Sequence, residues 1–252
     1  MAATHIFPDY GAQGQVHPAY VVAAGRASAL FAVLAGVSMS LVASRADSLR
    51  RFRVATVVRS VLLLVLGFGL GALDSPPLVI LEYYALLFLV AVPLLGLRTR
   101  TLGVLAVVWV LVSPPASHLL RWTVVPEFPV GEPDLLGLPV QQAVSGVYPV
   151  LTWTTYLLVG LALGRLPLRR QQVAWALLVG GAVFALAARA LSSVLLGLAG
   201  GRTGLDEGTP LPAEAVDRAL DVGLLGVTPA GDPAWLLVAA PHSGATLDLL
   251  GT

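Results

Sequence analysis

The sequence predicts an all-α fold, a polytopic bundle of transmembrane helices with about six full spans, as a single domain over residues 1–252. Of these residues 57% are hydrophobic and 12% are charged, about half the charged share of an ordinary soluble domain. Apolar runs long enough to cross about 30 Å of hydrocarbon recur along the chain. Cysteine is absent, which excludes disulfides and thiolate chemistry. The expected location is the cell membrane, with membrane lipids as partners and no nucleic acid.

The apolar runs define the six spans in chain order. They cover 20–44, 54–73, 78–97, 101–113, 147–164 and 171–197. The fourth run is the shortest, and it reaches spanning length only if the helix continues through Pro114 and Pro115 as a kinked end.

The segments outside the spans carry two further expectations. Residues 198–235 are expected to form an outer loop. Within it Val216, Leu220 and Leu224 recur at helical spacing, which predicts a short amphipathic helix. Both chain ends fall on incomplete apolar segments, so we expect a chain truncated at both ends relative to a complete bundle.

The distribution of arginine predicts the orientation of the bundle. All 15 basic residues are arginine, and most lie in the loops 45–53, 98–100 and 165–170. Because basic residues are concentrated in cytoplasmic loops, these three loops are expected to face the cytoplasm. The alternate segments carry most of the 14 carboxylates. The first and last residues are therefore expected on the non-cytoplasmic side.

Four ionisable side chains fall inside the apolar runs: Arg26, Arg59, Glu82 and Arg189. Such a group in hydrocarbon costs a few kcal/mol and usually faces a partner or a water-filled cavity. From the helical rise, we expect Arg26 about 10 Å and Glu82 about 6 Å below the outer ends of their helices. Arg59 is the exception, within two turns of the cytoplasmic face.

The histidines share the outer side of this topology. They are His5, His17, His118 and His242. A polar, titratable cavity that opens outward is the simplest common explanation, and for each one alone the alternative is an interfacial residue bonded to a headgroup or carbonyl. A neutral imidazole can take a proton from an amine or hydroxyl that attacks a carbonyl. It can also carry an acyl group itself.

Other polar residues are candidates to support such a cavity. Arg26 could stabilise an oxyanion, and Glu82 could orient an imidazole or simply pair with Arg26. Tyr83 supplies a hydroxyl or belongs to the aromatic belt, and His242 is a further supporting residue. The sequence contains no zinc-type HExxH spacing, no GxSxG elbow and no phosphate-binding glycine loop, so those functions and a metal site lack support.

Several motifs together resemble a known family. THIFPDYGAQGQVHPAY followed by LFAVLAGVSMSL gives a polar step, then a histidine with a small residue and an aromatic, then a helix. The segments RSVLLLVLGFGLG and VILEYYALLFLVAVPLL follow in order, and GVYPVLTWTTYLLVGLALGRL is the most specific match. In this order the chain resembles the heparan-alpha-glucosaminide N-acetyltransferase catalytic-domain family and its bacterial membrane relatives.

The resemblance implies an acyltransferase. Acetyl-CoA or another acyl-CoA, a co-substrate rather than a bound cofactor, would be held from the cytoplasm, and its acyl group would reach an amino sugar or other envelope glycan or lipid outside. By position His17 would be the central catalytic residue and His5 a second polar contact. Glu82 and Tyr83 replace the glutamine-arginine pair of the relatives, which leaves the acceptor open and makes heparan sulfate itself an unexpected substrate.

Arginines at the cytoplasmic side gain a second role from this resemblance. Arg53 and Arg59 are candidates to meet the phosphates of coenzyme A, because arginine forks suit phosphate groups. Topology alone already requires loop arginines, so this alternative stays open.

Two other functions stay open. A transporter or non-catalytic membrane component would use the same residues to line an outward-facing polar cavity. A transporter favours charges near the midplane and paired repeats, whereas here the charges crowd towards one face. The second alternative is that the chain is truncated and has no activity. Assembly into a homo-oligomer is compatible with the sequence.

Overall fold

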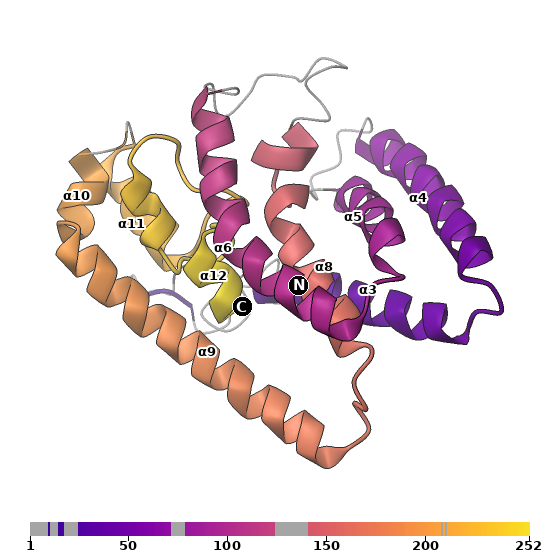
Figure 1. Ribbon diagram of the computed structural model, residues 1–252. Coiled ribbons are helices and arrows are strands. Elements are labelled where there is room, and N and C mark those ends of the chain that lie inside the picture. Colours follow the sequence, from indigo (N-terminus) through magenta and orange to yellow (C-terminus); the bar gives the residue numbers. More distant parts are fainter. Residues whose placement is uncertain are drawn as a thin grey trace.

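A computed structural model of the protein describes residues 10, 15–17, 25–71, 79–123, 141–207, 209 and 211–252. Apart from one isolated bridge between Tyr10 and Val16, the regular elements in these ranges are helices, so the all-α class is confirmed (Figure 1). The apolar helices are α3 (Arg26–Arg45), α4 (Leu49–Gly71), α5 (Leu81–Leu94), α6 (Thr99–Thr123), α8 (Val150–Leu163) and α9 (Gln171–Leu198). Shorter helices are η1 (Gln141–Ser145), α10 (Gly201–Glu207), α11 (Ala213–Asp221), η2 (Pro233–Leu237) and α12 (Thr246–Gly251).

Helix length divides the apolar helices into two groups. Helices α3, α4, α6 and α9 are long and apolar enough to cross a membrane, and this length and composition are those of a multi-pass membrane protein. Helices α5 and α8 have 14 residues each, which corresponds to roughly 21 Å and falls short of the hydrocarbon thickness. In the described ranges the six expected spans are therefore four long helices and two short ones.

Helix α6 differs most from its predicted length. The apolar run ends at residue 113, yet the helix continues through Pro114 and Pro115 to Thr123 and has 25 residues. Proline removes a single backbone donor, and neighbouring structure can compensate for that loss. The continuation through the proline pair, on which a full fourth span depends, is confirmed.

The first residues of α3 and α4 correct the predicted depths of Arg26 and Arg59. Helix α3 begins at Arg26 because Gly25 has a φ of 73°, a left-handed backbone that an α-helix does not contain. Arg26 therefore opens α3 instead of lying two turns inside it. Helix α4 begins at Leu49, earlier than predicted, so Arg59 lies about 15 Å along it, near its middle and not close to one end.

Helices α3 and α8 pack closely through small residues. A Cβ added to Gly36 of α3 would lie 2.6 Å from the carbonyl oxygen of Leu157, and one added to Gly160 of α8 would overlap the carbonyl oxygen of Val33. Small residues let helix backbones approach in this way in membranes. The main core forms around this contact, with Leu87, Leu102, Leu157 and Leu161 fully buried.

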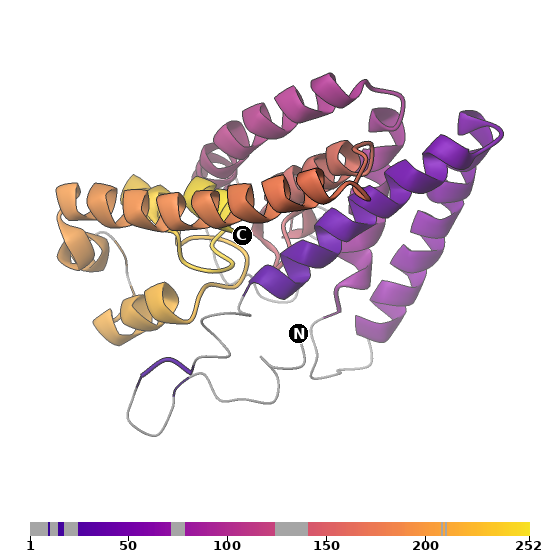
Figure 2. The ribbon, with the colours of Figure 1, turned by 90° about the horizontal axis from the view of Figure 1, so that it is seen from below.

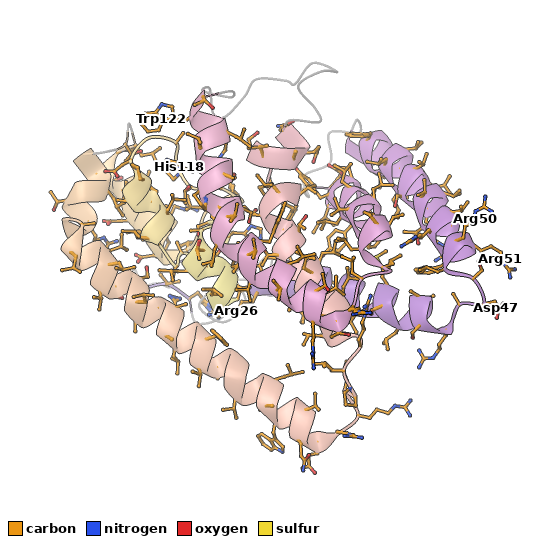
Figure 3. All side chains as sticks on the ribbon, in the orientation of Figure 1. Arg26, Asp47, Arg50, Arg51, His118 and Trp122 are labelled. Atoms are coloured by element: carbon orange, nitrogen blue, oxygen red, sulfur yellow. The ribbon has the colours of Figure 1, made fainter. Side chains whose placement is uncertain are left out.

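The three arginine-rich loops meet at one end of the bundle. The guanidinium of Arg165 donates to the carbonyl oxygens of Leu95, at 3.0 Å, and Leu97, and its Nε donates to Ser40 Oγ at 3.3 Å. Gly96 lies against the guanidinium of Arg53. We call this the arginine-rich end, and Figure 3 shows Asp47, Arg50 and Arg51 there, around the start of α4. Helices α3, α5 and α8 begin, and α6 ends, at the opposite end.

The chain after α9 folds into a small second core. Trp235, Leu205 and Val216 are buried in it, from η2, α10 and α11. The predicted amphipathic helix is α11, which buries Val216 and Ala219 in this core and contains Leu220, but it ends at Asp221, before Leu224. Figure 2 shows α10 and α12 beside the second half of α9. Helix α12 returns to the bundle, where Thr246 Oγ1 donates to the carbonyl oxygen of Val110 in α6 at 3.2 Å.

Candidate active site

His242 lies between η2 and α12, packed against the first turn of α3 at the end opposite the arginine-rich loops. Its Nε2 is 2.9 Å from Ser28 Oγ, and a Cβ added to Gly25 would lie 3.1 Å from its backbone nitrogen. The imidazole contacts the rings of Tyr148 and Trp153, with centroid distances of 5.4 and 5.6 Å. The site therefore joins α3, the start of α8 and the C-terminal loop.

The backbone of His242 is held in an unfavourable conformation. In the described ranges it is the one non-glycine residue with a positive φ, at 61°. This region costs an ordinary residue about 1–2 kcal/mol, and such residues persist where their surroundings fix them, often at functional sites. Here the N–H of Gly226 donates to the His242 carbonyl oxygen at 2.8 Å, and the N–H of Leu224 donates to that of Pro241 at 2.9 Å.

Burial keeps the His242 imidazole neutral. Desolvation lowers its pKa from 6.5 to about 4. Its Nδ1 is buried and has no hydrogen-bond partner in the part of the chain that the structure describes. A neutral ring with one unoccupied nitrogen is the form that accepts a proton or an acyl group.

Asp248 fixes the turn that follows His242. Its Oδ2 accepts a hydrogen bond from the N–H of Gly244 at 3.0 Å, and its Oδ1 accepts one from Thr252 Oγ1 at 3.2 Å. Burial raises the pKa of this carboxyl to about 6, and the hydrogen bonds from Gly244, Thr252 and Ser243 act in the opposite direction. Asp248 therefore stabilises this turn through its hydrogen bonds, and its carboxyl group is also titratable.

Two tyrosines of α5 reach the same end of the bundle. Tyr84 donates from its hydroxyl to the carbonyl oxygen of Ser28 at 3.1 Å. The Tyr83 hydroxyl accepts a hydrogen bond from the N–H of Val147 at 3.3 Å. The Tyr83 ring meets Tyr148 edge to face at 5.4 Å. Tyr83 therefore contacts Tyr148, whose ring in turn contacts His242. Tyr84 stabilises the turn that contains Ser28.

Arg26 lines a small cavity next to the His242 loop. Arg189 of α9, Pro241 and Asp248 line the same cavity, and Figure 3 shows Arg26 in this region. The volume of this cavity, about 20 Å³, gives room for roughly one water molecule. The structure therefore groups Arg26 with Arg189 and Asp248.

Glu82 lies apart from this group, against α4. A Cβ added to Gly67 would lie 2.9 Å from Glu82 Oε2. The side chain is buried, and Oε2 accepts no hydrogen bond from any described residue. The expected contact of Glu82 with Arg26 or with an imidazole is absent among the described residues.

The residues singled out through the family resemblance lie in different regions. His5 is outside the described residues. His17 is half-buried and follows Val16 directly in a short non-helical stretch. Arg53 is half-buried at the arginine-rich end, and its Nε has no partner within the described ranges. Arg59 is exposed on α4.

A second polar cluster at the same end as His242 joins α6 to the loop after α11. Arg121 is 3% exposed and donates to the carbonyl oxygen and, at 3.1 Å, the Oγ1 of Thr228. His118 lies one turn earlier, with Nε2 3.3 Å from the carbonyl oxygen of Gly231. Figure 3 shows His118 and Trp122 on the last turns of α6. This cluster anchors the loop that leads to His242.

The sequence pattern indicates His242 but not the residues that contact it. Ser28, Tyr148 and Trp153 carry no motif of their own, and Ser28 is 214 positions from His242 along the chain. The weak signal was the pair Gly25 and Pro241, since glycine and proline mark places where the backbone turns. Across the described residues, no three His, Asp or Glu side chains are grouped so that they could hold a metal ion.

The helices and this site define a multi-pass helical membrane protein with a buried histidine at one end of its bundle. In comparisons with known proteins, no family model, no curated protein and no solved structure matches the chain.

Proposed function

We propose that the protein is a membrane-embedded acyltransferase. It would move an acetyl or other acyl group from cytoplasmic acyl-CoA to an amino or hydroxyl group of an acceptor on the other side of the membrane. The observation that carries this proposal is the His242 imidazole, which is neutral, buried and held by a strained backbone with Nδ1 unoccupied. The motif order of the chain, with His17 near its start, supports the same class of reaction.

Charge distribution supports the direction of transfer. Arginine concentrates in cytoplasmic loops, so the arginine-rich end would face the cytoplasm and His242 the outside. Amino sugars and other envelope glycans or lipids are then the acceptors within reach. Helix α8 separates the two ends by roughly 21 Å, so the acyl group has to travel most of the length of the bundle.

The proposed reaction needs one base. The acceptor nitrogen or oxygen attacks the thioester carbonyl carbon, and an imidazole takes the proton that the acceptor loses. The carbon–sulfur bond then breaks, and the coenzyme A thiolate leaves and recovers that proton. His242 serves as this base, and Arg26 is the candidate to stabilise the oxyanion. In a two-step alternative, the His17 imidazole first attacks the thioester and the coenzyme A thiolate leaves; the acceptor then attacks the acyl-imidazole, which releases His17, while His242 takes the acceptor's proton. His5 is a second polar contact.

Coenzyme A would bind at the arginine-rich end. Arg53 is the better of the two phosphate candidates, because it lies at that end with an unoccupied Nε. Arg59 lies near the middle of α4 and is exposed, so it would reach a phosphate only by extending towards the arginine-rich end.

Acyl transfer in liposomes tests the proposal. The full chain is reconstituted with labelled acetyl-CoA on one side and a panel of amino sugars and envelope lipids on the other. His242→Asn removes the imidazole, and asparagine tolerates a left-handed backbone. We expect this variant to lose about 100-fold or more in rate.

The control for this experiment is Ser38→Ala, which changes an exposed serine of α3 outside the site. We expect Ser38→Ala to retain the parent rate. An H242N rate equal to that of the parent would overturn the assignment of the base. Passage of label across the membrane without any acylated acceptor would indicate a transporter and overturn the proposal.

A further inference from the structure

The hydrogen bonds of Ser28 limit the protonation state of His242. Ser28 Oγ is 3.1 Å from the carbonyl oxygen of Gly25 and 2.9 Å from His242 Nε2. A serine hydroxyl has one proton to donate, whereas its oxygen can accept further hydrogen bonds. The proton therefore goes either to the Gly25 carbonyl or to the imidazole.

The two arrangements leave different groups at Nδ1. If Ser28 donates to Gly25, then His242 donates from Nε2 and its Nδ1 carries a lone pair. If Ser28 donates to Nε2, the neutral ring carries its proton on Nδ1. Since Nδ1 is buried and has no partner among the described residues, the second arrangement would bury an N–H without an acceptor. Buried N–H groups without a partner are rare, and unsatisfied acceptors are less so.

We propose that Ser28 is a positioning residue that holds His242 in the Nε2–H tautomer, so that Nδ1 is the nitrogen that takes the proton. The role of Nδ1 in transfer rests on the proposed function, but the tautomer does not. The hydrogen bond made by one ring nitrogen commonly sets the state of the other in this way.

The surroundings of Ser28 fit this role. The left-handed backbone of Gly25 begins the turn whose carbonyl oxygen Ser28 faces, and Tyr84 donates to the Ser28 carbonyl oxygen. When Nδ1 takes a proton, the Nε2–H can still donate to Ser28 Oγ, which donates onward to Gly25. The chain of hydrogen bonds therefore stays intact through the reaction, and burial keeps the resting ring neutral.

Nitrogen NMR of the full chain, with ¹⁵N-labelled histidine, reads the tautomer directly. The His242 signals are assigned by their loss in H242N. At neutral pH we expect Nδ1 of the parent to resonate far downfield as a non-protonated nitrogen and Nε2 as a protonated one. Ser28→Ala removes the acceptor of the Nε2–H, so we expect its spectrum to shift towards the other tautomer or a mixture of both.

Two variants complete the experiment. Ser28→Thr keeps a hydroxyl and should restore the parent tautomer. Ser38→Ala, an exposed serine on the same helix, should leave it unchanged. A parent with its proton on Nδ1, or an S28A spectrum equal to that of the parent, would overturn the proposal.

Kinetic measurements then test whether His242 acts as the base, independently of which tautomer it adopts. If His242 is the base, S28A lowers kcat by about tenfold or more and leaves the KM for acyl-CoA unchanged, and S28T recovers the rate. An Nε2–H tautomer that is lost in S28A and kept in S28T, in a parent that transfers no acyl group, would overturn the proposed function but confirm the role of Ser28 as the residue that sets the tautomer.

Discussion

At the scale of single residues, the pKa shifts of His242 and of Asp248, six residues further on in α12, have opposite effects on how stability changes with pH. The pKa of His242 is lowered to about 4, so its contribution to stability is full above 6.5 and is lost as the pH falls from 6.5 towards 4. The pKa of Asp248 is raised from 3.8 to about 6, so its contribution is full below 3.8 and is lost as the pH rises through 6. In the overlap of these two ranges the changes partly cancel.

Replacing Asp248 should reveal how the lowered pKa of His242 alone changes stability with pH. In Asp248→Asn the amide oxygen can still accept from Gly244, but the carboxyl no longer titrates. We expect the free energy of unfolding of this variant to fall more steeply than that of the parent as the pH is lowered through this range, by about 3 kcal/mol at most. Unfolding by denaturing detergent in mixed micelles, at several pH values, measures this.

The matched comparison is His242→Asn, which keeps Asp248. Its stability should rise relative to the parent as the pH falls through the same range. Other titrating groups are common to all three proteins, so differences between variants isolate the pair. Parallel pH curves for D248N and the parent would show that the two groups do not oppose one another.

At the scale of helices, the contact between α3 and α8 depends on glycine. A Cβ at Gly160 would overlap the carbonyl oxygen of Val33, which belongs to the backbone and cannot rotate away. Gly160→Ala should therefore force the helices apart and lower the free energy of unfolding by about 1–3 kcal/mol. Detergent-induced unfolding monitored by circular dichroism measures the loss.

Gly180→Ala in α9 is the control for this substitution. A Cβ at Gly180 meets nothing within 4 Å in the described structure. Because alanine is also the better helix former, G180A should be as stable as the parent or slightly more so. Equal stability of G160A and G180A would rule out close glycine packing between α3 and α8.

Helix existence followed from the sequence, but helix ends did not. Each long apolar run corresponds to a helix in the structure, because the length of an apolar run is a strong indicator of a transmembrane helix. The start of α3 depends on the left-handed backbone of Gly25, which does not show in the residue type alone. The end of α6 depends on whether the bundle tolerates Pro114 and Pro115, which is decided by packing and not by local preference.

The candidate site was predictable only in part. His242 stands out as a histidine in an outer segment, but its contact with Ser28 requires the chain after α9 to fold back onto α3. Glu82 looked suited to orient an imidazole by depth alone, and rotation about the helix axis turned it to Gly67 of α4 instead. The apolar runs of a sequence locate the helices, whereas the depth of a side chain depends on where its helix begins and its direction depends on how helices pack.

At the scale of the whole molecule, the two ends of the bundle differ in chemistry. Arg165 gathers the arginine-rich loops at one end through Ser40, Leu95 and Leu97. Ser28, Tyr148 and His242 meet at the other. The proposed function requires that these ends lie on opposite sides of the membrane, with the His242 site on the non-cytoplasmic side.

Cysteine labelling in intact cells tests this claim most directly, because the chain has no cysteine of its own. Asp47→Cys places an exposed thiol between α3 and α4, and Leu225→Cys places one in the loop next to His242, where Leu225 is 65% exposed. With a membrane-impermeant maleimide, we predict that L225C is labelled in intact cells and that D47C is labelled only after permeabilisation. Labelling of D47C and protection of L225C in intact cells would contradict it.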